Sequence, residues 1–220
     1  MKKKILLLLG GFLAVNIIRN KGMNSSKYPF IWGVILKGES KTFDDYNYYK
    51  RVSGFSKLYG KINAQNTLPF SNKKLTEMML GEVMAFQSES RDVKGQLWAT
   101  GRFQIIPSTL SSLVKRLKLS SSTLYSVDTQ YKMADALIDE RRTLRQYLNG
   151  QISDSETNLQ NATIDVAKIW SSVGVPYAMM GSRQMIQKDQ SYYQGGGDKA
   201  SVDSASVMTI LRQQRKSLGH

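Results

Sequence analysis

Apolar residues recur at helical spacing along much of the chain, and they predict a series of helices. The segment from Pro29 to Lys37 is almost entirely apolar, and Pro29 suits the first turn of a helix. Residues 41–70 are rich in Tyr, Gly and Asn and have no helical period, so we expect a loop with a small hairpin there. From Leu75 to Phe86, apolar residues again follow the i, i+3, i+4 spacing of an amphipathic helix.

The second half of the chain carries clearer signals for the ends of its helices. Asp128 is the expected N-cap of the longest helix, and Gly150 stands where a C-terminal stop belongs. The pattern Ser153-x-x-Glu156 matches a capping box, whereas residues 174–200 are rich in Gly and irregular. The helices expected here run from Pro107 to Leu117, from Asp128 to Leu148, from Ser153 to Trp170 and from Val202 to Arg215. The whole pattern predicts a mainly α fold with little sheet.

A short apolar run near the N-terminus lies between two groups of basic residues. Lysines at positions 2–4 precede the run of residues 5–18, and Arg19 and Lys21 follow it. The run is shorter than the roughly 20 residues of a spanning helix, but Lys and Arg at its ends can reach the membrane surface. No small-x-small cleavage site follows it. We therefore expect an uncleaved signal-anchor; a cleaved signal peptide and a buried helix are the alternatives.

This interpretation divides the chain into three parts. Residues 1–21 form the signal-anchor, which enters the membrane through residues 5–18. Residues 22–28 form a linker, and residues 29–220 form the main domain. Because basic residues before an apolar run favour the cytoplasmic side, the main domain is expected outside the inner membrane.

Two residue types are almost absent, and their absence excludes several reaction classes. The chain has no Cys, and its one His is His220 at the C-terminus. Disulfides, thiolate zinc sites, Cys nucleophiles and catalysis through an imidazole inside the fold are therefore excluded. Any proton transfer falls to carboxylates, Lys or Tyr, and we expect neither a metal nor a cofactor.

The balance of charge favours an anionic partner. The net charge is +14, from 31 Lys and Arg against 17 Asp and Glu. Residues 1–27 hold six of the basic residues and no acid. Because the remaining excess is spread without a dense basic run, we expect no nucleic-acid partner.

Glu39 is the candidate for acid–base chemistry. It comes directly after the apolar segment of residues 30–36, where a buried helix emerges from the core. Burial of a carboxyl group favours its protonated form, which suits a general acid near neutral pH. The alternative is a solvated Glu at a helix end.

A second segment gives Glu39 a context. Residues 99–110, with the sequence ATGRFQIIPSTL, resemble the Gly-x-x-Gln stretch of phage lysozymes and lytic transglycosylases. In that family a Glu-Ser pair ends the first helix of the domain, as Glu39-Ser40 does here. Further similar stretches follow the order of the family at residues 80–85, 167–172 and 191–201. The resemblance covers about residues 29–215 and implies a mainly α, α+β lysozyme-like fold.

The resemblance also implies a role for each matching residue. Glu39 would protonate the β-1,4 glycosidic oxygen between N-acetylmuramic acid and N-acetylglucosamine. Ser40 would orient Glu39 or contact the N-acetyl group, and Gln104 would hydrogen-bond the sugar or Glu39. Besides Ser40, the resemblance implies a cleft wall formed by Gly101, Arg102, Phe103 and Gln104. It also implies sugar stacking by Tyr192 and Tyr193.

The way in which the bond is broken depends on a second carboxylate. A hydrolase normally uses two carboxylates, and Asp44 or Asp45 could supply the second. A lytic transglycosylase needs only one Glu, because the C6 hydroxyl of the muramic residue attacks and leaves a 1,6-anhydro product. Asp44 and Asp45 could equally belong to a solvated turn. The Asn-Tyr type motif of transglycosylases has no clear counterpart here, and Tyr177 is the nearest candidate.

The sequence therefore predicts an enzyme that cleaves peptidoglycan glycan strands, a muramidase or lytic transglycosylase. Its setting would be a phage virion or a lysis protein, or a bacterial secretion or conjugation machine, with the domain on the periplasmic side or in or on the virion. Its partners would be peptidoglycan, the membrane through residues 5–18 and other virion or cell-envelope proteins. The alternatives are a catalytically inactive peptidoglycan-binding structural protein and a basic membrane-tethered nucleic-acid-binding protein.

Overall fold

The computed structural model describes residues 26–52, 55–62, 71–88, 96–195 and 199–220. The predicted signal-anchor of residues 1–21 lies outside these ranges. None of the helices within them combines the length and apolar character that crossing a membrane requires.

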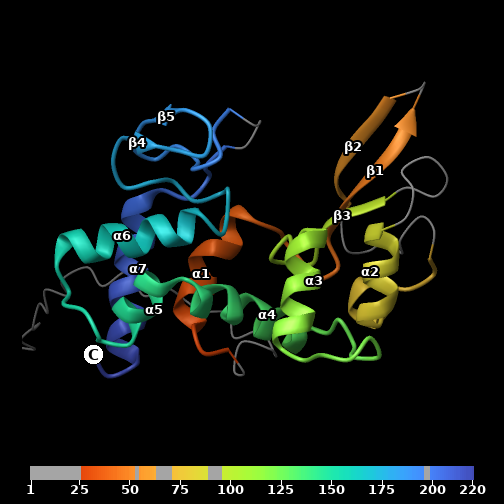
Figure 1. The fold of residues 1–220 in the computed structure, drawn as a ribbon, viewed down its shortest axis with the longest axis horizontal. Coiled ribbons are helices and arrows are strands. Elements are labelled where there is room, and N and C mark those ends of the chain that lie inside the picture. Colours follow the sequence, from red (N-terminus) through yellow and green to blue (C-terminus); the bar gives the residue numbers. More distant parts are fainter. Residues whose placement is uncertain (1–25, 53–54, 63–70, 89–95, 196–198) are drawn as a thin grey trace, which may run out of the picture.

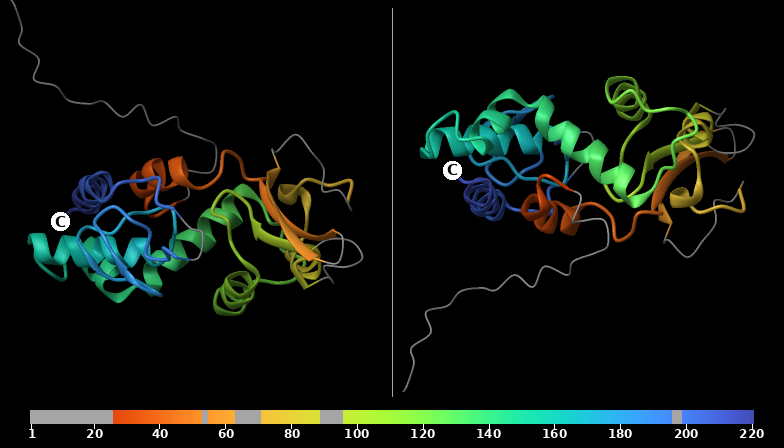
Figure 2. Two further views of the ribbon diagram at one scale, coloured as in Figure 1. Left: turned by 90° about the horizontal axis from the view of Figure 1, so that it is seen from above. Right: turned by 90° about the horizontal axis from the view of Figure 1, so that it is seen from below.

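The elements form two groups that α4 (Val127–Glu140) connects (Figure 1). One group holds the main sheet with α2 (Leu80–Ser88) and α3 (Pro107–Arg116). Two further views show the same division (Figure 2). The helices of the other group are α1 (Pro29–Gly38), α5 (Arg142–Leu148), α6 (Glu156–Ala167) and α7 (Ser204–Ser217).

Helix α7 is the centre of the helical group, because it contacts α1, α5 and α6. The first and last helices are also joined by a polar contact, in which the Phe30 amide donates to Gln214 Oε1 at 3.0 Å. This contact therefore fixes the first turn of α1 against α7.

The main sheet has three antiparallel strands in the order β2–β1–β3. The hairpin predicted within residues 41–70 is formed by β1 (Tyr46–Val52) and β2 (Phe55–Ile62), and β3 (Gln96–Thr100) pairs with the other edge of β1. A second, two-stranded sheet joins β4 (Met179–Met180) to β5 (Met185–Ile186) within the region expected to be irregular. The fold is therefore mixed α and β, with more sheet than the sequence pattern indicated.

The helix expected from Leu75 is interrupted. Leu75–Glu77 forms a 3₁₀ turn, and α2 begins only at Leu80. Between them Met78 is extended, because its carbonyl accepts a hydrogen bond of 2.8 Å from the Tyr125 amide. The long-range pairing of this strand-like segment outweighs its helical pattern.

The long helix predicted from Asp128 to Leu148 is two helices. The chain bends at Arg141, whose ψ of 107° is extended, between α4 and α5. The bend is stabilised by α6, where Asp165 accepts the Leu144 amide at 3.1 Å and so caps the first turn of α5. Two N-caps also differ from prediction. The N-cap of α4 is Ser126 rather than Asp128, and that of α6 is Ser155 rather than Ser153.

Aromatic side chains connect the two groups of elements. Trp32 of α1 is fully buried and makes edge-to-face contacts with Phe103 and Trp170, at centroid distances of 5.0 and 5.4 Å. Phe103 in turn packs on Tyr131 of α4 at 5.3 Å. Such large apolar surfaces contribute strongly to stability, so these rings fix the first half of α1 against the loop after β3 and the segment after α6.

The last residues of the predicted linker pack against α4. The carboxylate of Asp135 accepts hydrogen bonds from Ser26 Oγ and the Lys27 amide, both at 2.8 Å, and from Trp32 Nε1 at 3.1 Å. Tyr28 is buried and donates to Asp139 at 2.5 Å. Residues 26–28 are therefore fixed against α4.

Candidate active site

Glu39 lies at the C-terminal end of α1, where it is partly exposed. Its amide still bonds the Ile35 carbonyl at 3.3 Å, so it is the last residue that the helix positions. Ser172 Oγ donates a hydrogen bond of 2.5 Å to Glu39 Oε1. One carboxylate oxygen of the predicted catalytic residue is thus bound by a hydroxyl from the segment after α6.

Gly38 is the reason that Ser172 can come so close. A Cβ atom at Gly38 would lie 2.8 Å from Ser172 Cβ and Oγ and from Ser201 Oγ, which is too close for side-chain packing. Ser172 is itself fixed, because its carbonyl accepts the amides of Ser201 and Val202 at 2.8 and 2.9 Å. Three segments therefore meet at the end of α1.

Asp45 organises the turn that follows Glu39. Its Oδ2 accepts Ser40 Oγ at 2.5 Å and the amides of Lys41 and Thr42 at 2.9 and 3.1 Å, while Oδ1 accepts Thr42 Oγ1 at 2.9 Å. Burial alone would raise the pKa of Asp45, but these hydrogen bonds outweigh it and the pKa is lowered. Asp45 is only 2% exposed, so its carboxylate is committed to the turn rather than to a water molecule on a substrate.

Asp44, the other candidate for a second carboxylate, faces away from this turn toward the 3₁₀ segment. Its Oδ1 accepts the amide of Thr76 at 2.8 Å and Thr76 Oγ1 at 2.7 Å. Both aspartates therefore have structural partners.

The Gly101–Gln104 loop lies beside the turn of Asp45, as the resemblance implies. Gly101 has a φ of +73°, and its amide donates to the Asp45 carbonyl at 2.8 Å. Arg102 Nη1 donates to the Lys41 carbonyl at 2.5 Å. Gln104 has a φ of +50°, and its Nε2 closes the loop by donating to the Gly101 carbonyl at 2.7 Å.

Gln104 also contacts the sheet. Asn47 Nδ2 donates to Gln104 Oε1 at 3.2 Å, which fixes both polar atoms of the Gln104 amide. Asn47 was not recognised in the sequence, because a polar residue at a strand start carries no distinctive pattern.

Several buried polar atoms surround this loop without a hydrogen-bond partner among the described residues. They are Tyr46 Oη, Asn47 Oδ1, Arg102 Nε and Tyr131 Oη. Burial, with a smaller contribution from Tyr48, raises the pKa of Tyr46 to about 12, so its hydroxyl remains a donor at neutral pH. Buried polar atoms are nearly always hydrogen-bonded, so these atoms are exceptions beside the loop, as is Gln87 Oε1 of α2.

Two of the predicted substrate residues have other roles. Phe103 is 2% exposed and packs in the aromatic core, so it does not form a cleft wall. Ser40 is also buried, and its hydroxyl is donated to Asp45 rather than to Glu39. The hydroxyl that contacts Glu39 belongs to Ser172.

Tyr192 and Tyr193 lie in the loop after β5. Tyr193 Oη donates to the Lys168 carbonyl at 2.7 Å, and the two rings meet edge to face at 5.2 Å. Lys168 Nζ lies 5.4 Å from the centroid of the Tyr192 ring. These contacts fasten the loop to the end of α6, and both rings are partly exposed.

Comparison with protein-family models, with curated proteins and with solved structures found no match to this chain. Within the ranges that the structure describes, no group of three or more His, Asp or Glu side chains is arranged to hold a metal ion. The candidate site consists of Glu39 and Ser172, with the turn of Asp45 and the Gly101–Gln104 loop beside them.

Proposed function

We propose that this protein cleaves the β-1,4 bond between N-acetylmuramic acid and N-acetylglucosamine in peptidoglycan, with Glu39 as the general acid. The observation that carries the proposal is the Ser172–Glu39 hydrogen bond at a helix end that closely packed segments fix in place. A positioned carboxyl group is what proton transfer to a glycosidic oxygen requires.

The environment of the two aspartates favours the single-carboxylate route. Asp44 and Asp45 are both engaged by local hydrogen bonds, which leaves Glu39 as the carboxyl group for the chemistry. Glu39 would first donate its proton to the glycosidic oxygen as the bond breaks. It would then accept the proton of the muramic C6 hydroxyl as that oxygen attacks C1 and forms the 1,6-anhydro ring.

Residues beside Glu39 would bind the glycan. Gln104 and Asn47 are partly exposed amides held against each other, and Arg102 is a partly buried cation in the same loop. Amide and hydroxyl groups are suited to the N-acetyl and hydroxyl groups of the sugars. The proposed setting is a phage virion or lysis protein or a cell-envelope machine, with peptidoglycan as the partner.

The test uses the full-length protein on purified peptidoglycan sacculi, with mass spectrometry of the released fragments. Glu39→Gln is the inactivating variant, and Glu77→Gln is the matched control because Glu77 is exposed and lies on the 3₁₀ turn. The proposal would be supported if the wild type and the Glu77→Gln control release fragments with anhydromuramic ends and the Glu39→Gln variant does not.

The other outcomes each contradict part of it. Reducing muramic ends would support cleavage but overturn the single-carboxylate route. Intact sacculi from the wild type would overturn the enzyme, and sacculus binding without cleavage would favour a structural peptidoglycan-binding protein. Affinity for DNA that falls steeply with salt would favour the nucleic-acid-binding alternative.

A further inference from the structure

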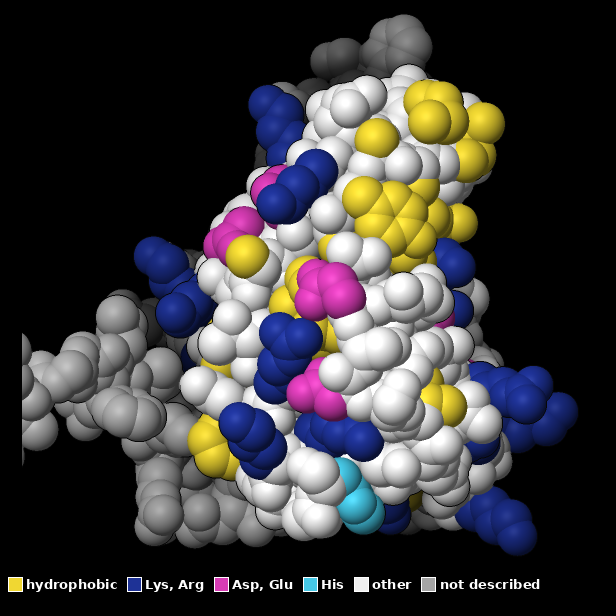
Figure 3. Space-filling view, turned by 90° about the vertical axis from the view of Figure 1, so that its left-hand side faces the viewer, with side chains coloured by type: hydrophobic (Ala, Val, Ile, Leu, Met, Phe, Trp, Pro, Cys, Tyr) yellow, Lys and Arg dark blue, Asp and Glu magenta, His cyan; other side chains and the backbone are white. Residues whose placement is uncertain are grey.

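The β4–β5 hairpin carries the most exposed large apolar side chains of the described residues. Met180 and Met185 are 62% and 59% exposed, and Tyr177, just before β4, is 40% exposed. Figure 3 shows apolar side chains gathered on the upper part of the molecule, where this hairpin lies. We call residues 177–188 the methionine hairpin.

The hairpin presents these side chains rigidly. Met180 pairs with Met185 across the two strands, while Ile186 in the neighbouring pair is fully buried and anchors the hairpin. The Gly181 amide closes the turn on the Gln184 carbonyl at 2.9 Å, and the Ser182 amide donates to the Tyr192 carbonyl at 2.9 Å. The exposed methionines therefore need no rearrangement before they meet a partner.

Basic residues accompany the methionines. Arg183 stands in the turn between the strands and Lys188 follows β5; both are exposed. Neither forms an ion pair with an acid in the part of the chain that the structure describes. They place two positive charges beside the apolar tip, in a chain whose net charge is +14.

We propose that the methionine hairpin docks on an anionic lipid surface. Met180 and Met185 would enter the boundary between headgroups and acyl chains, and Arg183 and Lys188 would contact lipid phosphates. Apolar side chains flanked by cations bind such interfaces through buried area and electrostatic attraction together. This contact is separate from the predicted signal-anchor and from the proposed cleavage of glycan.

The size and chemistry of the tip favour lipid over other partners. A stable protein interface takes about 20–30 residues from each side, whereas the exposed apolar part of this hairpin is a few side chains. An anionic glycan would explain the cations but would offer no apolar phase to the methionines. A lipid interface accommodates both features.

The absence of Cys from the chain makes a site-specific test direct. The full-length protein would carry Ser182→Cys, labelled with a fluorophore that reports an apolar environment, at the hairpin turn. Ser122→Cys, exposed in the loop after α3, would carry the same label as the positional control. Each protein would be mixed with vesicles of phosphatidylcholine alone or of an equimolar mixture with phosphatidylglycerol.

We expect the label at position 182 to report an apolar environment on the mixed vesicles, and the label at position 122 to change little. Adding Met180→Asp and Met185→Asp should weaken this response at least about tenfold. Each Met side chain that leaves water for the lipid interface contributes substantially to the free energy of binding. Met79→Asp and Leu124→Asp, both at positions 41% exposed, form the matched control and should leave the response intact.

Three results would overturn the proposal. One is an unchanged label at position 182 while the protein sediments with the vesicles, because binding would then use another segment. Another is an equal response on neutral vesicles or at position 122. The third is a response that grows with protein concentration without vesicles, which would assign the hairpin to a second copy of the chain. Circular dichroism would verify that every variant folds.

Discussion

Ser172 Oγ lies 2.5 Å from Glu39 Oε1, although 133 residues separate the two in the sequence. Ser172 is buried, and its own backbone is held by the segment that leads to α7. The hydroxyl is therefore preorganised, and it limits the orientations that the Glu39 carboxyl group can adopt. A hydrogen bond of this kind would position the proposed acid without taking part in bond breaking.

Replacing Ser172 with Ala should slow cleavage while the fold survives. Loss of a hydrogen bond to a charged group costs about 1.5–3 kcal/mol, which corresponds to a roughly ten- to hundredfold lower kcat. KM for soluble glycan fragments should change little, because Ser172 positions Glu39 rather than the sugar. Ser171→Ala is the control, since Ser171 is the adjacent serine. An unchanged kcat in Ser172→Ala would contradict the proposal that Ser172 positions Glu39.

Gly38 should be far less tolerant of a side chain than Gly33 in the same helix. A Cβ at Gly38 would displace Ser172 or Ser201, whereas a Cβ at Gly33 meets no atom within 4 Å. We expect Gly38→Ala to reduce cleavage at least about tenfold and to lower stability by about 1–3 kcal/mol from overpacking. Gly33→Ala should instead raise stability by about 0.5–1 kcal/mol, because Ala favours the helix. Activity assays with urea unfolding of both variants would distinguish these outcomes.

Much of the helical framework could be predicted from local sequence. Pro29 and Pro107 each stand at the first turn of the helix that they were expected to begin, and Gly150 follows the end of α5. These signals are local, since a proline ring or a glycine acts on its own turn of backbone. The break at Arg141 has no such signal, because the apolar stripe continues through it and the cap comes from Asp165 in another helix.

The site could be predicted only in part for the same reason. Glu39 and the Gly101–Gln104 loop were singled out in the sequence, and the structure brings the loop against the turn that follows Glu39. Ser172 carried no signal of its own, since its role depends on the close approach of a distant segment to Gly38. Phe103 was assigned to a cleft wall by resemblance, whereas its burial follows from its size and apolar character.

Asp45 should make the stability of the domain depend on pH in the acid range. Its pKa is lowered in the folded protein, so its contribution is complete above the unfolded value of about 3.9 and is lost as the pH falls through the folded value. Asp45→Asn keeps the shape but loses the charge on the acceptor of Ser40 and the turn amides, at a cost of about 1–3 kcal/mol near pH 7.

Urea unfolding of the wild type and Asp45→Asn from pH 7 down to the acid limit of the fold would check this. The difference in unfolding free energy between them should shrink as the pH falls. Asp44→Asn provides a control with the same chemical change one residue away, and it should cost less, because Asp44 accepts from Thr76 alone through Oδ1. A difference for Asp45 that is constant with pH would contradict the assignment.

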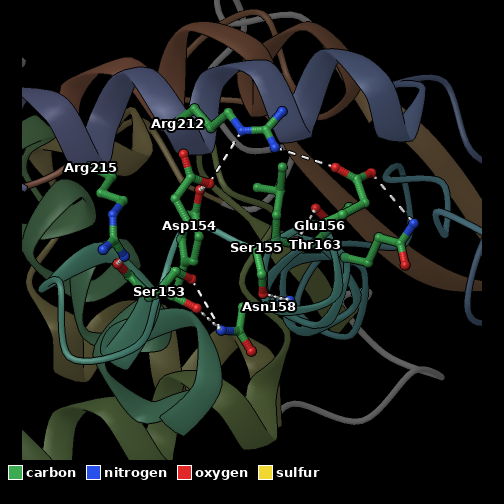
Figure 4. A network of polar contacts seen from close by, with 11 residues as sticks. Ser153, Asp154, Ser155, Glu156, Asn158, Thr163, Arg212 and Arg215 are labelled. Carbon is green, nitrogen blue, oxygen red and sulfur yellow. Dashed lines mark hydrogen bonds and ion pairs between the residues drawn. The ribbon is translucent and has the colours of Figure 1, made fainter.

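Figure 4 shows Arg212 of α7 in contact with Asp154 and Glu156 at the start of α6. We expect Tyr147 to stabilise this network more than these ion pairs do. Tyr147 is buried and donates to Asp154 Oδ1 at 2.6 Å, and burial, followed by Asp154 itself, raises the pKa of the tyrosine. Arg212 contacts Asp154 at 3.2 Å and Glu156 at 3.3 Å, but the side chains of Arg212 and Asp154 are 42% and 40% exposed.

Because water and salt screen exposed pairs, Arg212→Met should cost less than about 1 kcal/mol, and its effect should fade at high salt. Tyr147→Phe should cost about 1.5–3 kcal/mol at any salt concentration, because it removes a hydrogen bond to a charged acceptor from a buried residue. Lys216→Met, an exposed cation on the same helix, is the matched control for loss of charge. Urea unfolding at low and high salt would decide the order, and a larger, salt-resistant effect of Arg212→Met would show that the ion pairs dominate the contact.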